Sequence, residues 1–150
     1  MGRLTPALAA GLSLWAVAAA THAFELVSEQ EAQQSRAAAV QPVARSPLPP
    51  GAPAIKLLAP DTAATVSSPT RIELRFEPGP QASIRPETFK VLYGAFKVDI
   101  TKRITERSQV NAQGIQVTQA HLPKGSHRLI VEIQDSAGRV GERMISFVVD

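Results

Sequence analysis

Few residues in this sequence have side chains that could carry out catalysis. The chain has three histidines, His22, His121 and His127, and no cysteine. A chain without cysteine forms no disulfide, no thiolate metal site and no thiol nucleophile. Neither His121 nor His127 lies in a Gly-x-Ser-x-Gly turn, a His-Glu-x-x-His helix or a phosphate-binding glycine loop. We therefore expect no enzyme, no catalytic residue and no cofactor. We expect His127 to pack or to form local hydrogen bonds, and His121 to be a loop residue.

Three aspartates are the other residues that could bind a metal ion. Asp61, Asp99 and Asp135 all lie at the ends of expected strands, where loops can gather. Calcium takes about six to eight oxygen ligands, usually from several carboxylates. Because these aspartates are far apart in the sequence and aspartate commonly caps turns, we expect turn caps and no metal site.

The charges are mixed along the chain. Lys and Arg number 16 against 13 Asp and Glu, which gives a net charge of +3 at pH 7. Arginines and glutamates alternate along the second half instead of forming a basic patch, so we expect a solvated surface and no nucleic-acid partner.

The N-terminus has the pattern of a signal peptide. Arg3 precedes an apolar stretch from Ala7 to Ala20, which leads to the small-residue pattern Thr21-His22-Ala23. This stretch is shorter than the roughly 20 residues that span a bilayer. We expect residues 1–23 to be removed, leaving a periplasmic or secreted protein that starts at Phe24. We expect it to have no stable membrane insertion and to be monomeric when isolated.

Residues 24–54 are expected to form a spacer. Ser28-Glu29-Gln30-Glu31 is a capping-box pattern and predicts a helix through about Val40. Five prolines between Gln41 and Pro53 then favour an extended, semi-rigid segment.

From residue 55 the hydrophobic pattern has a period of two. Arg71 to Phe76 alternates charged and apolar residues, and the pattern recurs at Arg128 to Gln134 and at Ile145 to Val149. Weaker strands are expected at residues 55–58, 89–93, 97–100 and 115–118, with turn sequences between them. Seven short strands in residues 55–150 predict one all-β sandwich.

The order of motifs resembles a known class of domain. Pro60-Asp61 and Ser68-Pro69 precede the first clear strand, and Leu122 to His127 leads on to Asp135-Ser136-Ala137-Gly138-Arg139. This order resembles bacterial immunoglobulin-like and fibronectin-III-like domains of envelope proteins. The resemblance implies a seven-stranded immunoglobulin-like β-sandwich, but its motifs are structural and say little about function.

The strand order is also similar to that of small periplasmic copper-resistance proteins. That family takes ligands from an N-terminal histidine and from an Asp-Gly-His turn. Here Arg139 ends the corresponding turn and cannot ligate a metal, while His22 is expected to leave with the signal peptide. Copper handling is therefore an alternative function without matched ligands.

Strand alternation also predicts a contact surface. If Leu129, Val131 and Ile133 face the core, Ile130 faces outward, and the same reasoning places Leu92, Met144 and Val148 on that outer side. A contiguous apolar patch of this kind marks a contact site. We expect a non-catalytic periplasmic or secreted interaction module. The occupant of the patch would be another envelope protein or the chain's own Phe24, Leu26 and Val27.

Overall fold

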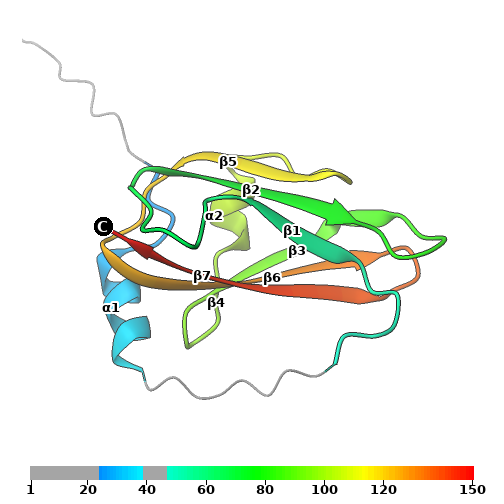
Figure 1. Cartoon of the computed structure of the whole chain (residues 1–150), viewed down its shortest axis with the longest axis horizontal. Helices are drawn as coiled ribbons and strands as arrows, with labels where there is room; N and C mark the ends of the chain where they lie inside the picture. Colours follow the sequence, from blue (N-terminus) through cyan, green and yellow to red (C-terminus); the bar gives the residue numbers. More distant parts are fainter. Residues whose placement is uncertain (1–23, 39–46) are drawn as a thin grey trace, which may run out of the picture.

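The fold is a two-layer β-sandwich. The computed structural model describes residues 24–38 and 47–150. One sheet has the order β1-β2-β5 and the other β4-β3-β6-β7, and all paired strands run antiparallel (Figure 1). The strands are β1 (Ala54–Ala59), β2 (Thr70–Glu77), β3 (Ile84–Tyr93), β4 (Val98–Asp99), β5 (Gly114–Ala120), β6 (Gly125–Asp135) and β7 (Val140–Val149). The expected seven-stranded immunoglobulin-like sandwich is confirmed.

Alternating side chains build the core between the two sheets. In β2, Ile72, Leu74 and Phe76 are buried while Arg71 and Arg75 are exposed. The inward residues of the longest hairpin follow the same rule: Leu129, Val131 and Ile133 in β6, and Ile145, Phe147 and Val149 in β7, are all buried. Because successive strand residues point to opposite faces, this parity fixes the outer face of the β4-β3-β6-β7 sheet.

Two short helices complete the described part of the chain. Helix α1 (Glu29–Ala37) lies at one end of the sandwich, near the C-terminus of the chain (Figure 1), and α2 (Thr101–Thr105) follows β4. The capping box of α1 is present, since the Ser28 side chain accepts from the backbone N–H of Glu31 and the Glu31 carboxylate accepts from that of Ser28. The helix ends at Ala37, earlier than the expected Val40, because Ala38 has an extended backbone.

Residues 24–37 pack against the sandwich, which corrects the expectation of a spacer over this stretch. Leu26, Val27 and Ala32 have no exposed surface and belong to the same core cluster as the strands. The backbone N–H of Leu26 donates to the carbonyl of His121, and that of His121 donates to the carbonyl of Phe24, both at 3.0 Å. An apolar pair and a strand-like bridge therefore hold this segment in place.

The end of the expected spacer is also packed. Pro53 is fully buried, and a side chain at Gly141 in β7 would collide with the Pro53 carbonyl oxygen. The signal-peptide expectation for residues 1–23 and the part of the spacer at residues 39–46 lie outside the described residues. In the ranges that are described, no helix combines the length and apolar character needed to cross a membrane.

Candidate binding groove

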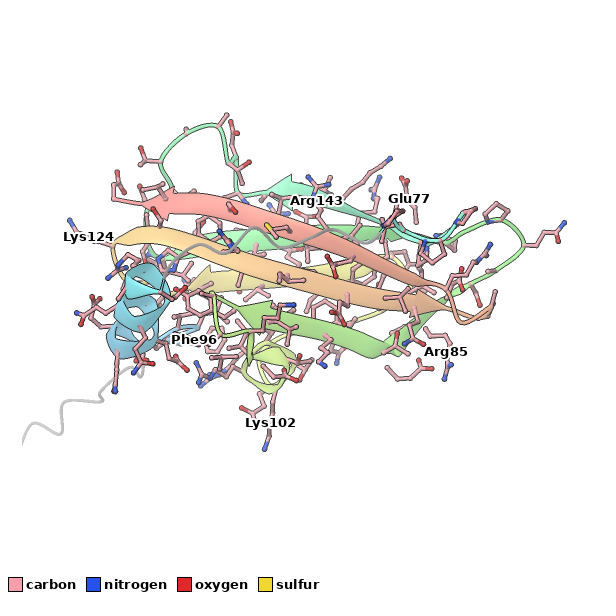
Figure 2. All side chains as sticks on the ribbon, turned by 90° about the horizontal axis from the view of Figure 1, so that it is seen from below. Glu77, Arg85, Phe96, Lys102, Lys124 and Arg143 are labelled. Atoms are coloured by element: carbon pink, nitrogen blue, oxygen red, sulfur yellow. The ribbon has the colours of Figure 1, made fainter. Side chains whose placement is uncertain are left out.

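A groove of about 750 Å³ lies at the α1 end of the sandwich, over the outer face of the β4-β3-β6-β7 sheet. Figure 2 looks onto this face and places α1 beside Lys124 and Phe96 at one end, with Arg85 at the other. One wall is α1, the other is the loop at residues 62–65, and the floor is formed by β6 and β7. The lining side chains include Ser35, Arg36, Ser126, Arg128, Ser146 and Val148.

Helix α1 is fixed in its wall position by polar contacts. The Arg36 guanidinium donates to the Lys124 carbonyl at 3.0 Å, and the Ser35 hydroxyl accepts from the backbone N–H of Ala95 at 3.2 Å. At the start of the helix, the Arg103 guanidinium donates to both carboxylate oxygens of Glu31, at 2.8 and 2.7 Å. These hydrogen bonds lower the pKa of Glu31 from 4.5 to about 2.

The opposite wall is held by the edge of β7. The backbone N–H of Val66 donates to the Val148 carbonyl at 2.8 Å, and that of Asp150 donates to the Val66 carbonyl at 3.2 Å. Within the loop, the Asp61 carboxylate accepts from the backbone N–H of Ala63 at 2.9 Å. Backbone pairing and an aspartate-capped turn thus build this wall.

The floor carries positive charge and hydroxyl groups. Register pairs Ser126 with Val148 and Arg128 with Ser146, so these four side chains form two adjacent rows on the outer face. Among the residues that the structure describes, no aspartate or glutamate lines the groove. Arg36 forms an ion pair with Glu29 at 3.2 Å, whereas Arg128 has no partner among the ion pairs of the described residues.

His127 lies beneath the groove and is fully engaged. Its Nε2 is 2.7 Å from the Pro123 carbonyl and its Nδ1 is 2.8 Å from the Tyr93 hydroxyl. Because a carbonyl can only accept, Nε2 carries the proton and Nδ1 accepts from Tyr93. Burial lowers the pKa of His127 and raises the pKa of Tyr93 to about 12. The expected local role of this histidine agrees with these contacts, which use both ring nitrogens.

The four residues of the expected apolar patch are placed in two groups. Leu92, Ile130 and Met144 are register partners and form one row across β3, β6 and β7. Val148 lies apart from them, on the groove floor, with 45% of its surface exposed. Ile130 is only 4% exposed, which corrects the expectation that it is a surface residue. It sits on an interior strand, where the half-buried Leu92 and Met144 shield it from both sides.

Asp61, Asp99 and Asp135 each accept hydrogen bonds within their own turn. Asp99 accepts from the backbone N–H of Thr101 at 2.9 Å, much as Asp61 does in its loop. Asp135 is fully buried and accepts from the backbone and the side chain of Arg139. Burial alone would raise the pKa of Asp135, but these hydrogen bonds hold it below its usual value. Among residues 24–38 and 47–150, no three His, Asp or Glu side chains gather as a metal site.

Sequence reasoning found the floor of the groove only in part. Val148 was expected on the outer face, and the same alternation places Ser126, Arg128 and Ser146 there. The walls were missed because they come from a segment expected to be a spacer and from a turn between strands. No local sequence signal links those two segments.

Comparison with known proteins assigns no function to the chain. No protein-family model matches the chain, and no curated protein matches it. Among solved structures, the chain is similar to CopC from Methylosinus trichosporium OB3b, with 16% sequence identity and a TM-score of 0.41. The alignment covers 64% of this chain and 93% of that chain. The expected distant similarity to a copper-resistance immunoglobulin-like protein is confirmed by this match, which carries no argument about fold, residue or ligand here.

Proposed function

We propose that this protein is a non-catalytic interaction module of the cell envelope, periplasmic or secreted, that holds a segment of a partner protein in the groove beside α1. The observation that carries the proposal is the groove itself. Three segments far apart in the sequence, α1, residues 62–65 and the β6-β7 floor, form one concave surface.

The walls of the groove are fixed before any partner arrives. Arg36 and Ser35 anchor one wall, and the backbone pairing of Val66 with β7 anchors the other. A surface that is already ordered loses little conformational entropy when it binds, so most of the contact energy remains available for affinity. Concave, preformed sites of this size are where proteins usually bind their ligands.

Val148 supplies the apolar contact of the groove. Single exposed apolar residues are ordinary on protein surfaces. Val148, however, is one of four large apolar residues that are at least 45% exposed among the described residues, and it lies inside the concave surface. Well-packed apolar residues at the centre of an interface contribute most to binding, so Val148 is the position to probe first.

The test is site-specific photo-crosslinking in cells. A photoreactive amino acid at Val148 in the full chain should capture a partner that mass spectrometry identifies and that binds the purified protein. A photoreactive amino acid at Thr118, an exposed residue of β5 in the other sheet, is the matched control. Equal capture at both positions, or capture of nothing that binds when purified, would exclude the groove as the contact surface.

A further inference from the structure

We propose that the partner segment is an extended peptide that begins in this groove and continues beyond it along the outer face of β6 and β7, with an apolar, an acidic, an apolar and a basic residue at alternate positions. This inference rests on the proposed function and specifies the chemistry of the partner. It comes from four successive rows of side chains on the outer face of β3, β6 and β7.

The rows follow from strand register. Ser126 and Val148 form the first row and Arg128 and Ser146 the second. The third row is Leu92, Ile130 and Met144, and the fourth is Lys90, Glu132 and Glu142. Each row lies two residues further along β6 and β7 than the one before. The face therefore changes from apolar to cationic, then to apolar and finally to a net negative row.

The second row determines the acidic residue of the peptide. Arg128 is half-buried, and the described ion pairs leave it without a carboxylate. The Ser146 hydroxyl lies beside it in the same row and can donate to the same carboxylate. A charge-assisted hydrogen bond from a guanidinium is among the stronger polar contacts a surface can offer.

The spacing of the rows matches an extended peptide. Consecutive rows on a strand are separated by two residues, about 6.6 Å, and alternate side chains of an extended peptide repeat at the same distance. A peptide that runs along β6 and β7 therefore places residues i, i+2, i+4 and i+6 over the four rows in turn. Val148 then contacts the first, apolar residue of the peptide, and Arg128 contacts the second, acidic residue. Met144 and Leu92 contact the third, apolar residue, and Glu142 contacts the fourth, basic residue.

The experiment uses the full mature chain and a labelled synthetic peptide, Val-Thr-Glu-Thr-Val-Thr-Lys. Fluorescence polarisation at low salt should show saturable binding. Replacing the Glu of the peptide with Gln should weaken binding about tenfold, and Arg128→Gln should weaken binding of the Glu peptide by a similar factor. Because both changes remove the same contact, the Arg128→Gln variant should bind the Glu and Gln peptides with equal affinity.

The matched control is Arg75→Gln. Arg75 is an exposed arginine on β2, in the other sheet, and it has no ion pair among the described residues. This variant changes the net charge as much as Arg128→Gln does, and its affinity for the Glu peptide should be that of the parent. Circular dichroism of both variants checks that the fold is retained.

The outcomes separate this inference from the proposed function. If a folded Arg128→Gln variant binds both peptides as the parent does, while crosslinking at Val148 still captures a partner, the acidic chemistry is wrong and the proposed function stands. If neither peptide binds until Val40 and Val43 are replaced with Asp, the chain's own residues 39–46 are the occupant, and the inference is overturned. A dimer that dissociates in Arg128→Gln would assign the face to a second copy and overturn it too.

Discussion

At the scale of single residues, the buried histidine His127 has a structural role. His127 is 3% exposed, stacks on Phe147 with ring centroids 5.7 Å apart, and forms a hydrogen bond through each ring nitrogen. A buried imidazole between a tyrosine hydroxyl and a backbone carbonyl is satisfied when neutral. Charging it would place a cation in the core.

Stability should therefore depend on the protonation of His127. Burial lowers the pKa of His127 in the folded state below its usual 6.5, so the unfolded chain binds the proton more tightly. The free energy of unfolding should be highest above pH 6.5 and should fall as the pH decreases below that value. Urea unfolding between pH 7.5 and pH 5 measures this slope.

The slope should flatten in His127→Gln, whose neutral amide cannot be charged, and it should persist in His121→Gln. Half-exposed His121 contributes its backbone to the bridge with Phe24 and Leu26. Parallel pH profiles for the parent and His127→Gln would show that another group is responsible.

At the scale of elements, the N-terminal segment behaves as part of the domain. Its contacts combine two buried apolar side chains, a backbone bridge to His121 and the Glu31–Arg103 ion pair. The ion pair links α1 to α2 through two residues that are 72 positions apart in the sequence. Because α1 also forms a wall of the groove, whatever loosens this segment changes the groove.

Glu31→Gln should loosen the segment without unfolding the sandwich. The Arg103 side chain is 41% exposed, so screening by solvent limits the loss to about 1 kcal/mol. Hydrogen exchange at the Leu26 amide, which donates to His121, should be faster in this variant. Glu29→Gln, which breaks the exposed pair with Arg36, is the control and should leave that amide protected.

The pH dependence of this contact has the same sign as that of His127 but lies at lower pH. The pKa of Glu31 falls from 4.5 to about 2 on folding, so the pair stabilises the segment fully above pH 4.5. This stabilisation is lost as the pH falls from 4.5 toward 2. Protection of the Leu26 amide that does not change over this range in the parent would exclude a role for the pair.

The elements differ in how far the sequence predicts them. The strands were predictable because Arg71 to Phe76 and Arg128 to Gln134 alternate without interruption, and a strand buried on one face requires that pattern. The start of α1 was predictable from Ser28 and Glu31. The docking of Leu26 and Val27 was not, because two apolar residues before a helix fit a local staple as well as a tertiary contact.

At the scale of the whole molecule, one turn connects parts of the chain that are far apart in the sequence. The turn between β6 and β7 contains Asp135 and Arg139, which bind each other at 2.8 Å. Arg139 also donates to the Pro80 carbonyl at 3.0 Å and so ties this turn to the connection between β2 and β3. The residues at this turn hold two loops together.

Copper titration of the mature chain should show no stoichiometric binding. Both ring nitrogens of His127 form hydrogen bonds, and the Arg139 guanidinium at the end of the β6-β7 turn cannot ligate a metal. Isothermal titration with the protein that starts at Phe24 measures this directly, and mass spectrometry verifies the start. If the parent binds one copper ion and His121→Gln binds none, the expectation is contradicted and a copper-binding function is supported.

The burial of Leu26 and Val27 has a consequence for biosynthesis. A signal peptidase must hold a few residues on each side of its cleavage site in an extended, accessible form. Cleavage after Ala23 would place that site one residue before Glu25, which bridges to His121, and two residues before fully buried Leu26. In the folded domain those residues already pack against the sandwich and form hydrogen bonds with it. If residues 1–23 are a signal peptide, as the sequence predicts, its removal must therefore precede folding of the domain.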